Sequence, residues 1–368
     1  MKVLVLSVST GGGHYSTSLA IADYIKKTGN DAKVVDVYEY VSPLISDSIS
    51  KGYLLSTKYA KNVYGSIYKK MEKTDATEKK IYLSKVANRV LSIPFAKCVG
   101  EYKPDVIIST HVMACEMVDA LRNSGRLDDN VITIGIVTDF TVHPLWEDTY
   151  VDYYISACEL LDNQFEKKKI DLDKVKPFGI PIDGKYANKI PKSEARKQLG
   201  IEDKDTVLVM SGSMGYGNVI KHIKALDKLD MYFQMLIVCG RNKSLYKRLS
   251  GLKTNKTKVV YGFANNIDVL MDASDCIITK PGGLTVSEAL AKGLPLILMN
   301  PIPGQEDRNL EFLLNNGLAQ FITDTYPVDD AVYQLFNNKW KQDYLSEGIK
   351  YIGKPNAVKD LCEFILSL

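Results

Sequence analysis

The sequence predicts an α/β fold in which two doubly wound sheets form separate domains, and three observations favour this class. The chain has 368 residues, which is more than one hydrophobic core usually serves. Short β-branched apolar runs recur in two series, with helical stretches between them. Most of these runs are continuously apolar rather than apolar at alternate positions, which is typical of parallel strands that are buried on both faces.

The two series of runs define the expected strands and the expected domain boundary. The first series covers residues 3–8, 33–37, 106–109, 131–137 and 153–156, and the second covers 206–210, 235–239, 258–261, 276–279 and 294–299. Between them, glycine and proline punctuate 178–183 and the periodicity stops before a polar stretch that ends at Lys192. We therefore place the domains at 1–184 and 185–350. Ligands of such sheets bind at the carboxyl ends of the strands, so the loops there are expected to line a cleft.

The composition is that of a folded globular protein, with 45% apolar and 25% charged residues. A net charge of +3 is too small to indicate nucleic acid as a partner. The six cysteines are scattered through apolar runs without close pairs, so we expect reduced core residues of a cytosolic protein. No run approaches the roughly 20 apolar residues of a membrane span, and residues 1–8 are interpreted as a buried strand rather than a signal peptide. Any membrane contact is therefore expected to be peripheral.

Glycine-rich loops follow the first strand of each series. The first loop, residues 9–14, contains three successive glycines and ends in Gly13 and His14, with a helix expected from about Ser16. Glycine lets the backbone approach an anion closely, and a helix N-terminus favours negative charge. The second loop, residues 211–218, includes Gly212, Ser213 and Met214. Both are predicted to bind an anionic group, although an ordinary strand-to-helix turn would explain each loop taken alone.

Three of the four histidines follow expected strands of the first half, namely His14, His111 and His143. Imidazole titrates near neutral pH, so one of them is a candidate general base. Asp139, at the end of another strand, could orient that imidazole or stabilise its charged form, or it could cap the next turn. The spacing does not match a metal site, and we predict no metal.

The most informative block runs from Lys280 to Asn309. Gly282 and Gly283 allow close backbone approach, Leu284 and Thr285 lie in the first turn of the expected helix, and Glu288 lies one turn on. A carboxylate there can accept hydrogen bonds from a ribose diol. Gln305 and Glu306, after the next strand, are suited to reading sugar hydroxyls, with Asn309 close behind in the sequence. A capped helix and two turns would account for the glycines but not for this polar set.

At these residues the sequence resembles the GT-B glycosyltransferases related to plant monogalactosyldiacylglycerol synthases and bacterial processive diacylglycerol glucosyltransferases. It is more distantly similar to the N-acetylglucosaminyltransferase that makes lipid II. The resemblance covers nearly the whole chain and is carried by Gly-Gly-Gly-His at 11–14, Thr-Asp-Phe at 138–140 with His143 and Trp146, Gly-Ile-Pro-Ile-Asp at 179–183, and the block at 280–309. It implies two Rossmann-like domains that face a central cleft, with a C-terminal helix, 351–368, that crosses back to the first domain.

The resemblance also implies the roles of the loops. The donor would be UDP-glucose or UDP-galactose, with Gly283 and Thr285 at the diphosphate, Glu288 at the ribose and Gln305 with Glu306 at the hexose. The backbone at 262–264, which is Gly262, Phe263 and Ala264, would border the uracil. His14 would be the base and Asp139 its helper, in a single displacement that inverts the anomeric carbon and gives a β-glycoside. Neither a cofactor nor a metal is required by this scheme.

The acceptor is expected to be diacylglycerol at the inner face of the cell membrane. Residues 51–103 carry twelve Lys/Arg against four Asp/Glu, with tyrosines such as Tyr64 and Tyr68 between them. Such a stretch can lie on an anionic bilayer, or it can be an ordinary solvated face. His111, His143 and Trp146 are predicted to lie on the acceptor side. The alternatives are a UDP-N-acetylglucosamine-dependent transferase or epimerase that uses another substrate, and a non-catalytic sensor of UDP-sugars.

Overall fold

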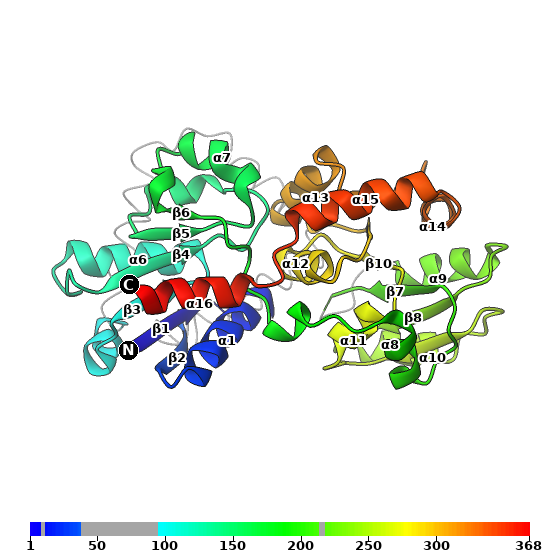
Figure 1. Cartoon of the computed structure of the whole chain (residues 1–368), viewed down its shortest axis with the longest axis horizontal. Helices are drawn as coiled ribbons and strands as arrows, with labels where there is room; N and C mark the ends of the chain where they lie inside the picture. Colours follow the sequence, from blue (N-terminus) through cyan, green and yellow to red (C-terminus); the bar gives the residue numbers. More distant parts are fainter. Residues whose placement is uncertain (9–11, 38–94, 213–217) are drawn as a thin grey trace. The chain divides into compact units, whose positions relative to one another are not determined.

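The computed structural model describes residues 1–8, 12–37, 95–212 and 218–368. These residues form two compact units. The first contains 1–184, 302–308 and 356–368, and the second contains 185–301 and 309–355. Each unit is built around one six-stranded sheet whose strands are all parallel, and helices connect the strands (Figure 1). The predicted α/β class with two parallel sheets is therefore confirmed.

The sheet of the first unit has the strand order β2-β1-β3-β4-β5-β6. Its strands are β1 (Lys2–Ser7), β2 (Asp31–Asp36), β3 (Val106–Ser109), β4 (Ile132–Ile136), β5 (Tyr153–Ile155) and β6 (Val175–Lys176). Its α-helices are α1 (Gly12–Lys27), α6 (Val112–Asn123), α7 (Asp162–Glu166) and α16 (Ala357–Ser367), and residues 95–102 are also helical. Short 3-10 turns are η1 (Pro144–Asp148), η2 (Glu159–Leu161), η3 (Leu172–Lys174) and η4 (Gly184–Ala187), the last of which leads into the second unit.

Both faces of this sheet are covered, which explains why its central strands β1, β3 and β4 are mostly apolar and buried. On one face α6 and the helical residues 95–102 bury Phe95, Val118 and Leu121 against the strands. On the other face α1 and α16 pack side by side and bury Ile21 and Leu361. Figure 1 shows α16, the last helix of the chain, beside α1. The sheet is thus fixed in the core, and its functional groups lie in the loops at the strand ends.

The sheet of the second unit has the strand order β12-β11-β10-β7-β8-β9. Its strands are β7 (Thr206–Met210), β8 (Gln234–Val238), β9 (Lys258–Tyr261), β10 (Cys276–Thr279), β11 (Leu296–Leu298) and β12 (Ala319–Phe321). The helices are α8 (Lys192–Leu199), α9 (Val219–Lys228), α10 (Lys243–Ser250), α11 (Ile267–Asp272), α12 (Gly283–Lys292), α13 (Gln305–Asn315), α14 (Val328–Phe336) and α15 (Lys339–Ile352).

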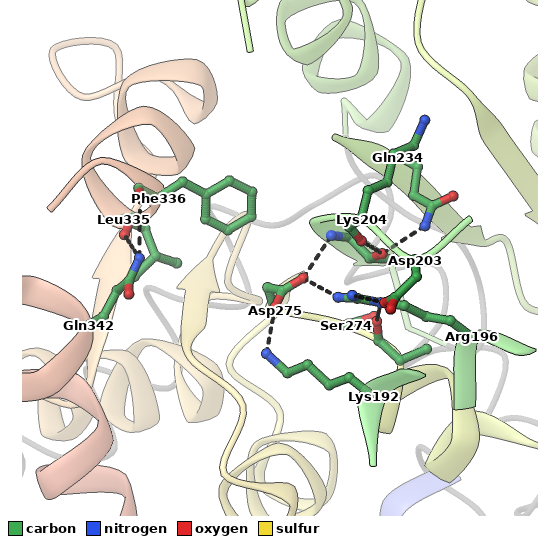
Figure 2. Close-up of polar contacts among 12 residues, drawn as sticks. Lys192, Arg196, Asp203, Lys204, Gln234, Ser274, Asp275, Leu335, Phe336 and Gln342 are labelled. Atoms are coloured by element: carbon green, nitrogen blue, oxygen red, sulfur yellow. Dashed lines mark hydrogen bonds and ion pairs between the residues drawn. The ribbon is translucent and has the colours of Figure 1, made fainter. Parts of the chain in front are cut away.

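A charged network ties α8 to the sheet of the second unit. The buried guanidinium of Arg196 donates to Asp203 and to Asp275, at 2.7 Å in each case (Figure 2). Asp275 also accepts from the ammonium of Lys192 and from the backbone N–H of Thr206 at the start of β7. Because each carboxylate and guanidinium group is paired, the cost of burying these charges is offset. The network lies at the amino ends of β7 and β10, opposite the loops that were predicted to bind ligand.

The cysteines behave as expected, since all six are free and buried. Within the described ranges, no helix is both long and apolar enough to cross a membrane.

Candidate active site

The imidazole of His14 is fixed at the carboxyl edge of the first sheet. The helix α1 begins at Gly12, four residues before the expected start at Ser16, because two glycines can adopt helical dihedrals as readily as the tight turn that was assumed. His14 is therefore in the first helical turn. Its Nδ1 lies 2.7 Å from the carbonyl oxygen of Thr110, which follows β3, and 3.2 Å from the hydroxyl of Thr138, which follows β4.

This contact decides which ring nitrogen of His14 can accept a proton. A carbonyl oxygen can only accept, so Nδ1 carries the hydrogen and donates it to Thr110, which leaves the lone pair of Nε2 unprotonated in the neutral ring. Burial lowers the pKa of His14 below its usual 6.5, while the negative charge of Asp139 and the Thr110 carbonyl act in the opposite direction. The ring is therefore neutral at pH 7, which is the state that a general base needs.

Hydroxyl groups hold the turn that carries His14. Ser18 donates to the carbonyl of His14 at 2.9 Å, and its Oγ lies 3.2 Å from the hydroxyl of Thr110. Thr110 donates in turn to the carbonyl of Leu6 at the end of β1. Ser18 and Thr110 are both fully buried. The first turn of α1 is thus tied to the ends of β1 and β3, so the position of the imidazole is set by the sheet.

His111 lies next to His14 but has a different role in the fold. The two ring centroids are 4.9 Å apart in an edge-to-face arrangement. His111 caps α6, and its Nδ1 accepts a hydrogen bond from the backbone N–H of Met113 at 3.2 Å. Burial, followed by the nearby His14 and His143, lowers the pKa of His111 to about 3. His111 therefore stays neutral at physiological pH and serves as a helix cap.

His143 and Trp146 lie in the loop after β4. His143 is the N-cap of η1, and its Nδ1 accepts from the backbone N–H of Leu145. Trp146 is 5% exposed, and its ring is packed against Gly135, where a Cβ would lie 2.9 Å from the indole, and against the ring of Tyr154. The indole is thus a core side chain that the glycine in β4 accommodates, and a role of Trp146 on the acceptor side stays a prediction.

Asp139 is paired with a residue that is far away in the sequence. The side-chain amide of Gln305, the first residue of α13, donates to Oδ2 of Asp139 at 2.6 Å, and residues 302–308 belong to the first unit. Arg308, one turn further along α13, donates to the hydroxyl of Thr141 and to the carbonyl of Val142. Asp139, which was predicted to assist the general base, and Gln305, which was predicted to contact sugar hydroxyls, are thus hydrogen-bonded to each other.

Glu306 lies beside Gln305 but points back at its own loop. Its Oε2 accepts from the backbone N–H of Ile302 at 2.6 Å, and Asp307 accepts from that of Gly304. Both carboxylates therefore stabilise the N-terminal turn of α13, where acidic side chains are favourable. This geometry shapes the loop, and a contact of Glu306 with sugar stays a prediction.

In the second unit, the loops after β7 and β10 lie against each other. Gly212 has φ +74°, which favours glycine, and a Cβ placed there would lie 3.1 Å from Cε of Lys280. Both positions follow adjacent parallel strands, β7 and β10. The backbone of Gly212 is thus covered by a cationic side chain at the sheet edge where anionic ligands of such folds bind.

The helix α12 begins directly beyond Lys280. Gly282 is its N-cap, and Gly283, Leu284 and Thr285 form its first turn, whose N–H groups have no partners within the helix. Asn309 is fully buried and donates to the carbonyl of Pro281 at 3.1 Å, which fixes the turn before the helix. Thr285 and Glu288 are both partly exposed. Positive charge and N–H groups that have no partners within the helix make this end of α12 suitable for a diphosphate.

The remaining donor-side predictions fall on the loop after β9 and on two residues outside the described ranges. Gly262 and Ala264 are partly exposed, and Phe263 is 61% exposed with the guanidinium of Arg241 5.6 Å from its ring centre. An aromatic face exposed at the strand end could stack on a base. Ser213 and Met214 of the glycine loop, and Tyr64 and Tyr68 of the basic stretch, lie outside the residues that the structure describes.

Comparison with known proteins places the chain in a family. The family model described as "Monogalactosyldiacylglycerol (MGDG) synthase" matches residues 14–182, and the model "Glycosyl transferases group 1" matches 191–347. A processive diacylglycerol beta-glucosyltransferase of Bacillus pumilus is 30% identical over 99% of this chain and 94% of its own length. Monogalactosyldiacylglycerol synthase 1 of Arabidopsis thaliana is 30% identical over 97% of this chain and 69% of its own length. The chain belongs to the diacylglycerol glycosyltransferase family.

Solved structures support the fold of this glycosyltransferase. MurG of Acinetobacter baumannii aligns with a TM-score of 0.64 at 16% identity, over 100% of this chain and 99% of MurG. The calicheamicin glycosyltransferase CalG4 aligns with a TM-score of 0.61, also at 16% identity, over 100% and 98%. These likenesses show a GT-B fold.

Several residues of the glycosyltransferase site were not singled out from the sequence. Thr110 and Thr138 hold the imidazole of His14, Lys280 covers Gly212, and Arg308 binds the loop after β4. Thr110 and Lys280 directly follow β3 and β10, and Thr138 lies two residues after β4, which is a signal that could have found them. Among the described residues, no group of three or more His, Cys, Asp or Glu side chains is placed to hold a metal ion.

Proposed function

We propose that the chain transfers a hexose from UDP-glucose or UDP-galactose to diacylglycerol and forms a β-glycolipid. The observation that carries this proposal is the fixed imidazole of His14, whose Nδ1 is occupied by Thr110 and whose Nε2 is the proton-accepting atom. The relatives of the chain are named as diacylglycerol glucosyltransferases and monogalactosyldiacylglycerol synthases, which supports a hexose and a diacylglycerol as the substrates.

We assign the acceptor to the domain of residues 1–184 and the nucleotide-sugar to the domain of residues 185–350. The C-terminal helix within 351–368 completes the acceptor domain. The first domain carries His14 and Asp139. The second carries the anion-binding end of α12, the partly exposed Glu288 for the ribose, and Phe263 for the uracil. Gln305 provides an amide for a hexose hydroxyl, and its bond to Asp139 orients that amide.

The proposed reaction is a single displacement. Nε2 of His14 takes the proton of the acceptor hydroxyl, the hydroxyl oxygen forms a bond to the anomeric carbon, and the bond from that carbon to the β-phosphate oxygen breaks. UDP leaves with the electron pair, and the configuration at the anomeric carbon is inverted. Lys280 and the N–H groups at the start of α12 stabilise the negative charge that develops on the diphosphate.

We further propose that the enzyme works at an anionic membrane surface. Diacylglycerol resides in the bilayer, so an enzyme that uses it must reach the headgroup region. The basic residues within 51–103 and the tyrosines among them suit that region, because lysine and aromatic side chains bind at the interface.

A donor panel with diacylglycerol vesicles tests the function. UDP-glucose, UDP-galactose and UDP-N-acetylglucosamine are offered to the full chain, and the lipid product and its anomeric configuration are determined. We expect β-linked hexose on diacylglycerol from one of the two UDP-hexoses. Consumption of UDP-N-acetylglucosamine without lipid product would instead indicate an epimerase.

The variant His14→Ala tests the base. We expect kcat to fall by about 10² to 10⁴, the usual contribution of a general base, while UDP binds as in the wild type. The matched control is His222→Ala, which removes a partly buried histidine of α9 in the second unit. Normal turnover by His14→Ala would refute the assignment of this residue.

A further inference from the structure

The second unit has a basic hollow that the proposed reaction does not use. Its volume is about 680 Å³, and it lies along α9, with contributions from α10 and α14 (Figure 1 labels all three helices). It is lined by Asn218, Ile220, Lys221, Lys224, Ala225, Lys228, Leu245, Arg248 and Asp329. Apart from Asn218, the last residue of the glycine-rich loop 211–218, none of these residues belongs to the predicted donor site.

The position of the lysines follows from the amphipathic pattern of α9. Val219, Ile223 and Leu226 are buried against the unit, which leaves Lys221, Lys224 and Lys228 on the exposed face. Arg248, near the end of α10, adds its guanidinium from the neighbouring helix. Four cationic side chains therefore converge on one concave surface.

In the part of the chain that the structure describes, none of the four makes an ion pair. Asp227 lies between Lys224 and Lys228 in the sequence, but its carboxylate accepts from the backbone N–H groups of Asn255 and Lys256. Asp329 is the single carboxylate in the lining. The hollow thus has a clear excess of positive charge.

This excess of positive charge is unfavourable by itself. Lys221 with Lys224, and Lys224 with Lys228, have the spacings at which side chains on a helix are neighbours, and like charges there repel. The charge of Lys221 also acts on its neighbour His222, whose pKa is lowered first by burial and then by this charge. An anion bound in the hollow would remove the repulsion.

We propose that this hollow binds a phosphate-bearing anion, as a second ligand site separate from that of the donor. Arg248 offers a planar fork that matches phosphate oxygens, and the lysines supply point charges around it. Ile220, Ala225 and Leu245 supply apolar surface for the organic part of a phosphate ester. A phospholipid headgroup and a free phosphate ester share this chemistry, and the experiment separates the two sources.

The test compares two triple variants of the full chain, each with UDP at saturation so that the donor site is occupied. The first, Lys221→Gln/Lys224→Gln/Arg248→Gln, removes three cations of the hollow. The control, Lys197→Gln/Lys253→Gln/Lys350→Gln, removes three exposed lysines of the same unit that do not line it. Glycerol 3-phosphate is titrated by calorimetry, and flotation is measured with phosphatidylcholine vesicles that do or do not contain phosphatidylglycerol.

We expect the first variant to bind at least about tenfold more weakly than the control, since each cation near an anionic surface adds to the binding free energy. If the first variant binds both glycerol 3-phosphate and vesicles more weakly than the control, the site is supported. If it binds only glycerol 3-phosphate more weakly, the site is supported and its ligand is a free ester. Weaker binding to phosphatidylglycerol vesicles alone supports the site with a headgroup as its ligand. Equal binding by the two variants in both assays overturns the proposal.

Discussion

The tautomer of His14 has a consequence for the pH dependence of the reaction. Because burial lowers the pKa of His14 below 6.5, the neutral form persists at pH values where a free imidazole would be protonated. We therefore predict that kcat/KM is constant from pH 8 down to about 6.5 and declines at lower pH, as Nε2 takes up a proton. A pH profile of kcat/KM checks this, with UDP affinity measured over the same range as the control. A decline that begins above pH 7 would contradict the neutral ring.

His111 makes a separate prediction about stability. Its pKa is about 3 in the folded protein and 6.5 when unfolded, so the unfolded chain binds a proton that the folded chain excludes as pH falls through this window. The free energy of unfolding should thus fall by up to about 2 kcal/mol between pH 7 and pH 5 on account of this residue. His111→Asn keeps a side chain that can cap α6 but does not titrate.

The difference in unfolding free energy between wild type and His111→Asn, measured by urea denaturation at pH 7 and pH 5, reports this residue alone, because His14 titrates in both proteins. We expect the wild type to lose more stability than the variant on acidification. Parallel pH dependences would show that His111 is hydrated enough to accept a proton in the folded state.

At the scale of elements, a buried ion pair anchors the end of α12. The ammonium of Lys292 lies 2.6 Å from Oδ2 of Asp272 at the end of α11 and also donates to the carbonyl of Asn188. Both side chains are almost fully buried. Lys292→Met leaves the Asp272 carboxylate buried without its partner, so we predict a loss of about 3 to 5 kcal/mol in unfolding free energy.

The double variant Lys292→Met/Asp272→Leu removes both charges and should recover part of this loss, because a buried pair is often replaceable by apolar side chains. Urea denaturation of the single and double variants measures the effect. If the double variant is no more stable than Lys292→Met, the lost stability comes from the contact with Asn188 rather than from the uncompensated charge of Asp272.

Whether a segment is a helix or a strand could be predicted from the sequence more accurately than the residues at which it begins and ends. Most strands were recognised because their apolar runs are continuous, whereas β6 has two residues and β12 has three, too few for such a signal. The start of α1 was placed too late because glycines permit both a turn and a helix. For the same reason, the glycine-rich segment before His14 was expected to be a loop, but Gly12 and Gly13 are helical.

The sequence suggested candidate site residues, but the contacts between them could not be predicted from it. Position after a strand pointed to His14, Asp139 and the first turn of α12. The bond from Gln305 to Asp139 joins residues 166 apart in the sequence, and no local pattern encodes such a contact. The burial of Trp146 could not be predicted, because an aromatic residue in a polar loop gives no sign of the glycine that makes room for it in the core.

At the scale of the whole molecule, charge is distributed unevenly along the chain. Residues 51–103 carry twelve Lys/Arg and four Asp/Glu, so the remainder has more acidic than basic residues although the net charge is +3. A protein with this distribution should approach an anionic bilayer mainly through the basic segment. Membrane binding should therefore depend on a small part of the sequence.

We predict that Lys69→Gln/Lys70→Gln/Lys80→Gln weakens binding to phosphatidylglycerol vesicles by about 100-fold, since each lysine near such a surface contributes about 1 kcal/mol. Flotation at increasing salt checks the mechanism, because the Debye length shrinks from about 8 Å at 0.15 M to about 3 Å at 1 M and should release the wild type. UDP binding should be unchanged in this variant. Vesicle binding that resists both the substitutions and salt would mean that apolar contacts, rather than the lysines of this segment, hold the enzyme at the membrane.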